Sequence, residues 1–414
     1  MKRPTILRVE AEDRRFDLEQ GAGTDAVHNI AQYAFAVTRL VTDSSLTGHG
    51  IVLTLGNGND VVCRLILALA ESLPKAPIEE LMANFGAVSR ALSDEPSLRW
   101  LGPHKGAVHL ALASITNACF DLWAKSRGVP LWKLLLDLTP REIVNLLDLS
   151  YLEEDLTADD AIRLIEAQSP GRDTRCQILG RGYPGYDTSV GWFQYDDAQL
   201  RDNARHALGE GFRALKLKVG SKVPARDIRR ASILREIAGP DCLLMLDANQ
   251  QWTVSQAEHV CQAVRELHLY WIEEPIHPDD IEGHVKLASQ IAPMRLALGE
   301  HVPNRIVFRN FLARRALHFV QADCTRLAGV SEFITVSLLA RKYGLPVVPH
   351  VGDMGQIHQH LVLFNHIVLG HEALLLEHIP HLRQYFVHPA QVENGVYRTP
   401  DSPGLSCDLK EPHA

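Results

Sequence analysis

The chain has 414 residues, 46% hydrophobic and 22% charged, which suits a folded protein with more than one domain. Its formal net charge of −8 argues against general nucleic-acid binding, which needs a basic face. Apolar runs such as residues 61–70 are interrupted by charges and fall short of the roughly 20 residues that span a bilayer, and the N-terminus lacks the apolar core of a signal peptide. We therefore expect a cytoplasmic protein without nucleic-acid or membrane partners.

The N-terminal third has the pattern of an α+β domain. Residues 34–42 and 49–55 are rich in β-branched and apolar side chains, and helical periodicity follows from 60 to about 138, including Gly106–Ser126. Strands followed by helices are typical of such a domain. Residues 158–192 are polar and contain glycine and proline, and we interpret them as a loop over an active site.

From residue 212 onward the pattern becomes regular, because short β-like runs alternate with amphipathic helical segments. Seven such runs occur, at residues 214–219, 243–246, 270–272, 296–298, 319–321, 345–348 and 374–376. Alternating strands and helices predict parallel βαβ units. Seven in succession favour a closed barrel, although an open doubly wound sheet has the same pattern.

Each run ends in an ionisable residue, and successive ones are 23 to 29 residues apart: Lys218, Asp247, Glu273, Glu300, Asp323, His350 and Glu377. Barrel enzymes carry their catalytic groups at the carboxyl ends of the strands. Any one of these residues, such as Asp323, has an equally good interpretation as a helix cap. Seven in phase indicate an active site.

Three of these residues predict a metal site. Asp247, Glu273 and Glu300 follow consecutive strands, so their carboxylates should converge on one point. Such a cluster repels itself unless a cation compensates it. Carboxylate oxygens suit a hard divalent cation, and we expect Mg²⁺.

The remaining residues predict acid–base chemistry. Lys216 and Lys218 are two residues apart on one strand, so both should face the barrel interior. Each ammonium group should lower the pKa of the other and so free one lysine as a base. His350 should lie across the barrel, with Asp323 holding its imidazole. Two bases beside a metal ion suit removal of a proton α to a carboxylate.

Six segments resemble the mandelate racemase-like branch of the enolase superfamily: FRALKLKVG (212–220), MLDANQQW (245–252), YWIEEPIHPDDIEGH (270–284), LGEHVPNR (298–305), FVQADCTRLAGV (319–330) and VVPH (347–350). The resemblance implies that Lys218 is the base, with Lys216 beside it. It also implies metal ligation by Asp247, Glu273 and Glu300, a dyad of His350 and Asp323, and a substrate-carboxylate contact from Glu377.

Segments outside the strands resemble the L-fuconate dehydratase family more specifically, among them GTDAVH (23–28), GNGND (56–60) and GYPGYDTSVGW (182–192). This likeness implies substrate contacts from Gly23, Thr24, Asp25, Tyr33 and Tyr183, and we expect further contacts from Lys216 and Asn249. The stretch VGDMGQIHQHL after His350 is shorter than the corresponding stretch of that family, which leaves the exact acid sugar open.

We therefore predict an α/β fold in which a modified TIM barrel, (β/α)7β, spans residues 146–390. An α+β capping domain spans residues 1–145, and the tail 391–414 completes it. The predicted reaction is Mg²⁺-dependent dehydration of an acid sugar, L-fuconate or a close relative, to a 2-keto-3-deoxy acid by a homo-oligomer. The alternatives are racemisation, epimerisation or aldarate dehydration, and a non-catalytic relative that binds acid sugars.

Cysteine and histidine usage predicts no second metal site. The seven cysteines are scattered without a CxxC pair, which fits reduced thiols. Eight histidines lie between residues 350 and 388, but no HExxH motif occurs and most lie in helical or loop segments without carboxylate partners.

Overall fold

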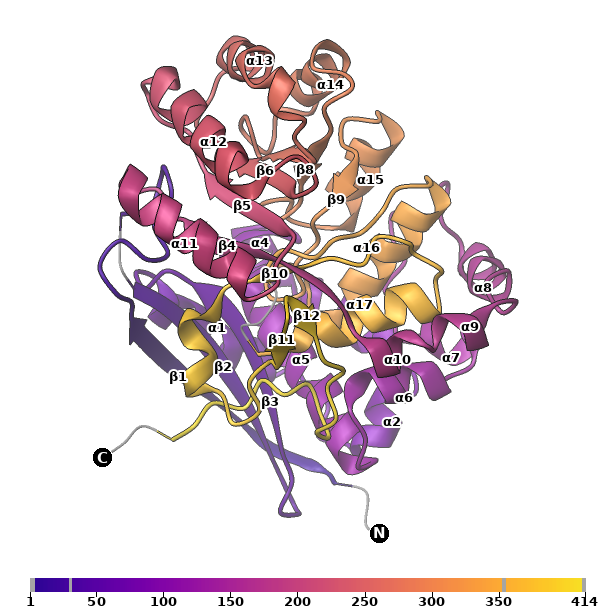
Figure 1. Ribbon diagram of the computed structural model, residues 1–414. Helices are drawn as coiled ribbons and strands as arrows, with labels where there is room; N and C mark the ends of the chain where they lie inside the picture. Colours follow the sequence, from indigo (N-terminus) through magenta and orange to yellow (C-terminus); the bar gives the residue numbers. More distant parts are fainter. Residues whose placement is uncertain (1–3, 30–31, 352–354, 412–414) are drawn as a thin grey trace.

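The computed structural model describes residues 4–29, 32–351 and 355–411 (Figure 1). Its N-terminal part contains an antiparallel sheet of three strands in the order β1 (Ile6–Asp17), β2 (Gln32–Thr42) and β3 (Thr47–Thr54). The first 60 residues were expected to form strands and turns, but β1 was not located individually, because this edge strand is only partly buried and carries charged residues on both faces.

Seven helices follow: α1 (Asn59–Ala70), α2 (Ile78–Met82), α3 (Phe85–Ser93), α4 (Pro96–Leu101), α5 (Gly106–Ser126), α6 (Leu131–Asp137) and α7 (Pro140–Asn145). Helix α5 packs so closely on the sheet that a Cβ atom at Gly50 would lie 2.0 Å from the Ser114 carbonyl oxygen. By length and composition α5 could cross a membrane, but 89% of its most apolar window is buried, as in the core helix of a soluble protein.

The interpretation of residues 158–192 as a loop was wrong. This segment forms three short helices, α8 (Ala158–Glu166), α9 (Arg172–Arg175) and α10 (Ile178–Arg181), and the strand β4 (Tyr183–Gly191). Strand β4 contains Pro184 and two glycines, which disguise it in the sequence. It forms because it pairs with β5, the next strand, and with β10, which lies far away in the chain.

The central sheet closes into the predicted barrel. Strands β4, β5 (Ala214–Lys218), β6 (Leu243–Asp247), β7 (Trp271–Glu273), β8 (Leu296–Leu298) and β9 (Phe319–Val320) are parallel neighbours in that order. A parallel bridge joins Val320 to Val347, and β10 (Leu376–His378) pairs with β4 and so returns to the first strand. The α/β barrel with an N-terminal capping domain is confirmed.

The barrel helices lie outside the strands (Figure 1). They are α11 (Asp197–Gly209), α12 (Pro224–Ala238), α13 (Val254–Ala263), α14 (Ile281–Gln290), α15 (Arg305–Ala313), α16 (Val330–Lys342) and α17 (Ile357–Ile367), with short 3-10 helices at Arg265–Leu267 and Pro380–Tyr385. Inside the barrel, an apolar cluster that includes Tyr186, Met245, Trp271 and Phe319 is buried. This layer forms a packed floor beneath the strand ends.

The C-terminal tail joins both parts of the molecule. Strands β11 (Val392–Glu393) and β12 (Val396–Tyr397) form a hairpin, and β12 pairs with the start of β4 in the barrel. Further on, Leu405 N donates to Asp121 of α5 at 2.8 Å and Asp408 pairs with Lys125 at 2.6 Å. The hairpin of the tail thus pairs with the barrel, whereas Leu405 and Asp408 contact the cap. The division into residues 1–145 with 391–414 and residues 146–390 stays a prediction.

Buried polar contacts hold the cap against the barrel. His109 Nε2 of α5 lies 2.7 Å from Glu332 Oε2 of α16. The side chain of Asn117, also on α5, donates to the Cys324 carbonyl at 3.0 Å and accepts from Val330 N at 3.0 Å. Because Cys324 and Val330 lie between β9 and the start of α16, these contacts fix the position of the cap on the carboxyl end of the barrel.

Candidate active site

A cavity of about 160 Å³ lies where the cap meets the carboxyl ends of the barrel strands. The barrel contributes Lys218, Asn249, Glu300, His350 and Glu377, and the cap contributes Gly23, Asp25, Tyr33, Leu53 and Leu55. Most of the residues expected at an active site therefore meet in one place.

Three carboxylates converge beneath this cavity as expected. Asp247 and Glu273 end adjacent strands and stand directly opposite each other in the register, and Glu300 follows β8. Each offers an oxygen within 4.8 Å of the other two, and both Asp247 and Glu273 are fully buried. Burial raises the pKa of Glu273 to about 8, although the nearby Lys216 acts in the opposite direction. An all-oxygen, convergent and electrostatically strained donor set fits a hard divalent cation.

The two lysines pair with these carboxylates. Lys216 Nζ lies 2.7 Å from Glu273 Oε1 and 2.8 Å from Glu377 Oε1, and Lys218 Nζ lies 2.5 Å from Asp247 Oδ2. Burial lowers the pKa of each lysine, but the surrounding carboxylates outweigh it and hold both pKa values above the ordinary value. Lys216 does lower the pKa of Lys218, as expected, but the carboxylates around both ammonium groups act more strongly. The expected net fall of one lysine pKa was therefore wrong for this arrangement.

His350 lies between two carboxylates. Its Nδ1 is 2.9 Å from Asp323 Oδ2, and its Nε2 is 3.0 Å from Glu300 Oε2. Burial lowers the pKa of His350, but Glu300 and Asp323 outweigh burial and raise it well above the ordinary value. The expected contact between His350 and Asp323 is present, and it leaves Nε2 directed toward the cavity and Glu300.

Glu377 and Asn249 are both oriented by backbone or hydroxyl contacts. Glu377 accepts from Thr188 Oγ1 at 2.6 Å and from Val351 N at 2.9 Å. Asn249 has a left-handed backbone conformation, with φ of 43°, and its N–H donates to Asp247 Oδ1 at 3.0 Å. The side-chain oxygen of Asn249 is buried without a hydrogen-bond partner among the described residues. Such an atom at a cavity wall is available to a ligand.

Of the expected cap contacts, Gly23, Asp25 and Tyr33 line the cavity, and Thr24 does not. The Thr24 hydroxyl donates to Gly21 O at 2.7 Å and accepts from Gln194 N at 3.2 Å. Thr24 therefore ties the cap loop to the segment after β4, and its side chain does not face the cavity.

The expected substrate contact from Tyr183 was wrong. Tyr183 is the first residue of β4, eight residues before Gly191, which pairs with Leu217 beside the cavity. The strand bulges between Asp187 and Gly191, and at about 3.3 Å per residue its two ends lie on the order of 20 Å apart. Tyr183 is buried at the amino end of the barrel, where its ring stacks on Tyr397 with centroids 5.7 Å apart.

Comparison with known proteins identifies the family. A family model described as enolase C-terminal domain-like matches residues 199–413, more than half of the chain. The chain belongs to the enolase superfamily. It is 38% identical to human mitochondrial enolase superfamily member 1 over 99% of this chain and 95% of that protein, whose crystal structure superposes with a TM-score of 0.95. It is 37% identical to L-galactonate dehydratase of Hypocrea jecorina over 99% of this chain and 93% of that one.

A more distant structure shows that the whole fold is shared within the superfamily. L-talarate/galactarate dehydratase from Salmonella typhimurium, solved with Mg and L-lyxarohydroxamate, is 24% identical and has a TM-score of 0.77. The alignment covers 99% of this chain and 91% of that one. The cap and the barrel are therefore both common to these proteins.

The cavity of this enolase-superfamily protein has further lining residues to which the sequence assigned no role: His28, Trp192, His301 and Arg326. His301 Nδ1 lies 3.0 Å from Glu274 Oε2, and Arg326 donates to the Glu300 carbonyl at 2.7 Å. His28, His301 and Arg326 all lie in segments that carry the family resemblance, next to assigned residues. Their closeness in the sequence to residues with an assigned role is the signal that could have identified them as lining residues.

Proposed function

We propose that the protein is a Mg²⁺-dependent hydro-lyase that dehydrates an acid sugar, with L-fuconate as its substrate. One observation carries this proposal. Lys218 and His350 line the same cavity of about 160 Å³, and three convergent carboxylates lie beside them. A base, an acid and a cation site around one small cavity are what removal of a proton α to a carboxylate, followed by loss of a hydroxyl, requires.

In this proposal Asp247, Glu273 and Glu300 hold the cation. When bound, the ion supplies positive charge next to the substrate carboxylate, where negative charge grows as the α proton leaves. Lys216 and Glu377 fix the surroundings of that carboxylate through their mutual contact at 2.8 Å.

The protein's own groups carry the proton transfers. Lys218 accepts the C2 proton at Nζ once a cation held by Asp247 and its neighbours compensates the negative charge that otherwise favours its ammonium form. His350 then donates a proton from Nε2 to the departing 3-hydroxyl, and the resulting enol becomes the 2-keto-3-deoxy acid. Asp323 supports this step because its contact with Nδ1 leaves Nε2 as the nitrogen directed toward the substrate.

Two observations support L-fuconate. The curated relative from Hypocrea jecorina is named L-galactonate dehydratase, and L-fuconate is 6-deoxy-L-galactonate, so both acids have the same configuration from C2 to C5. The two acids differ only in a methyl or hydroxymethyl group at C6. Apolar side chains line part of the cavity, namely Leu53, Leu55 and Ile379, and they favour the methyl group.

The test is a panel of acid sugars assayed for 2-keto-acid formation with Mg²⁺ present. We expect the highest kcat/KM for L-fuconate, lower values for L-galactonate and D-arabinonate, and weak activity on the C2 epimers. A dicarboxylic sugar acid turned over in preference to all of these would contradict the fuconate assignment. C2 epimers formed without any 2-keto acid would instead identify an epimerase, and binding without either product would identify a non-catalytic relative.

Two further predictions from the sequence remain predictions, namely the homo-oligomeric state and the cytoplasmic location. The human relative has the word mitochondrial in its name, which describes that protein. Size-exclusion chromatography with light scattering and fractionation of the source cells would test them.

A further inference from the structure

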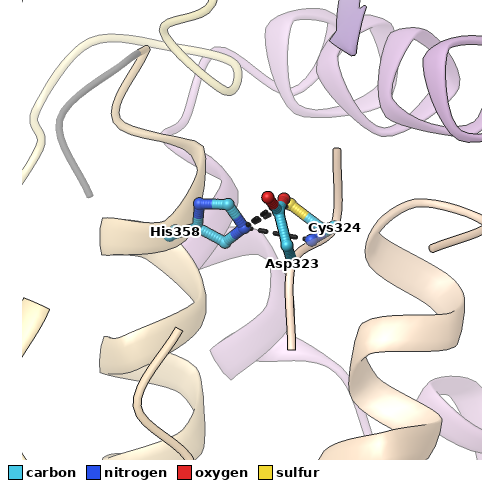
Figure 2. Close-up of side chains that lie close together, drawn as sticks. All are labelled: Asp323, Cys324 and His358. Atoms are coloured by element: carbon cyan, nitrogen blue, oxygen red, sulfur yellow. Dashed lines mark hydrogen bonds and ion pairs between the residues drawn. The ribbon is translucent and has the colours of Figure 1, made fainter. Parts of the chain in front are cut away.

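A second histidine contacts the dyad carboxylate from the side opposite His350. His358 lies in the first turn of α17 and is 1% exposed. Its Nε2 is 3.2 Å from Asp323 Oδ1, 3.0 Å from Cys324 N and 3.2 Å from Cys324 Sγ. Figure 2 shows the imidazole ring directed from the helix toward the carboxylate and the cysteine. No role was assigned to this residue from the sequence.

The two oxygens of Asp323 have separate partners. Oδ2 faces His350 Nδ1 at 2.9 Å, while Oδ1 accepts from both the backbone N–H and the hydroxyl of Thr325 at 2.7 Å. His358 lies on the Oδ1 side. A carboxylate whose one oxygen is held in this way cannot rotate, so its other oxygen keeps a constant direction toward His350.

The peptide that carries Asp323 is also held from two sides. The Cys324 N–H donates to His358 of α17, and the Cys324 carbonyl accepts from Asn117 of α5 at 3.0 Å. The turn that follows β9 is therefore fixed between a barrel helix and a cap helix. Of these two contacts, only the one from His358 also lies beside the Asp323 carboxylate.

We propose that His358 is a positioning residue that holds Asp323 in the orientation needed to align His350 as the acid. This inference rests on the proposed function, in which His350 protonates the departing hydroxyl. Without the imidazole, the Cys324 N–H loses its acceptor, and the turn that carries Asp323 loses its tie to α17, so the whole residue can shift relative to His350. Lys218 is independent of this arrangement, because it pairs with Asp247 on another strand. The two half-reactions should therefore respond differently.

Asp323, Cys324 and His358 together offer oxygen, sulfur and nitrogen atoms that could bind a soft metal ion. The hydrogen bonds favour the positioning role, because the Nε2 lone pair already accepts from Cys324 N and Asp323 Oδ1 already accepts twice from Thr325. The experiment below includes the metal as an outcome.

The variants are His358→Leu, which removes the hydrogen-bonding ring, and His358→Gln, which keeps a polar atom near the position of Nε2. The matched control is His360→Leu. His360 is equally buried on the same helix. Its Nδ1 accepts from Trp132 N at 3.3 Å, a contact that does not involve His350 or Asp323. Thermal unfolding establishes that each variant is folded.

With the Mg²⁺-loaded enzyme and its best acid sugar, we expect His358→Leu to lower kcat for dehydration by about 10- to 100-fold, as loss of an outer contact to a catalytic group typically does. KM and the rate of C2 proton exchange with D₂O should stay within about threefold. His358→Gln should recover most of the loss, and His360→Leu should resemble the wild type. An unchanged kcat in His358→Leu, or an equal fall in exchange and dehydration, would overturn the proposal.

One readout does not depend on activity. In spectra of histidine-labelled protein, the Nδ1 proton that His350 shares with Asp323 should be seen in the wild type, in His358→Gln and in His360→Leu, and should be lost or broadened in His358→Leu. Its persistence in His358→Leu would overturn the positioning role even if no acid sugar is dehydrated. Stoichiometric zinc in the purified protein, lost in His358→Gln, would also overturn it in favour of a metal site.

Discussion

Replacing His350 by asparagine separates the two proton transfers of the proposed reaction. The histidine contacts Asp323 through Nδ1 and Glu300 through Nε2. Asparagine can occupy the same space and donate a hydrogen bond to Asp323, but it cannot give up a proton. Lys218 lies on a different strand and pairs with Asp247, so removal of the C2 proton should continue.

The expected size of the effect follows from the role of the group. A positioned general acid contributes about 10²- to 10⁴-fold to a rate, which corresponds to about 3 to 5 kcal/mol of activation free energy. The cost to folding is smaller, because Asp323 keeps both hydrogen bonds from Thr325. One weakened buried contact costs about 1 to 3 kcal/mol, less than the 5 to 15 kcal/mol by which domains are typically stable.

The assay follows L-fuconate in D₂O with Mg²⁺ and measures two products in the same sample. NMR reports loss of the C2 proton signal, and a colorimetric reaction reports 2-keto acid. His350→Asn should form 2-keto acid at about 10⁻² to 10⁻⁴ of the wild-type rate and still exchange the C2 proton. The counterpart Lys218→Ala should lose both signals.

Two results would refute this reasoning. If Lys218→Ala dehydrates at nearly the wild-type rate, the base is another residue. If His350→Asn loses exchange and dehydration to the same extent while its Mg²⁺ affinity is unchanged, the two bases do not divide the work, and His350 takes part in both steps.

Three further predictions concern the metal site, the cap and the core. Exhaustive chelation should abolish activity, and Mg²⁺ should restore it. Glu273→Gln should weaken Mg²⁺ binding at least about tenfold in calorimetry, because one charged oxygen ligand is lost. Full activity without divalent ions would exclude this metal site. Gly23 has φ of 70°, and a Cβ atom there would lie 2.6 Å from the Leu18 side chain and 3.1 Å from the Tyr33 ring. Gly23→Ala should therefore cost about 1 to 2 kcal/mol in denaturant unfolding and raise KM for the acid sugar, whereas an unaltered KM would show that this loop does not shape the cavity. Burial lowers the pKa of His371 to about 4, and its Nε2 lies 3.1 Å from Ser337 O. The His371 imidazole takes up a proton near pH 6.5 in the unfolded chain but not in the folded protein, so the free energy of unfolding should fall as the pH drops from 6.5 to 4. Between pH 7 and 5, the free energy of unfolding of His371→Gln should fall by about 2 kcal/mol less than that of the wild type in urea titrations. Parallel curves of this free energy against pH for the two proteins would contradict the assignment.

The sequence by itself determined the candidate site in outline. Asp247 and Glu273 could be placed together because each ends a short strand of a regular βα repeat, and parallel strands bring such ends to one edge. The same rule placed Lys218 at the cavity. The spacing of chemically suited residues is a local property, so it is readable without knowledge of what packs against what.

Other features depend on partners far away in the chain, and only the tertiary structure decided them. Strand β4 exists through its pairing with β5 and β10, and this pairing puts Tyr183 at the far end of the barrel. The direction of the lysine pKa shifts depends on how many carboxylates surround each ammonium group. The contact between His358 and Asp323 joins residues from a helix and a strand end, and no periodicity in the sequence encodes it. Packing and electrostatics are sums over three-dimensional neighbours, whereas the sequence alone specifies neighbours along the chain.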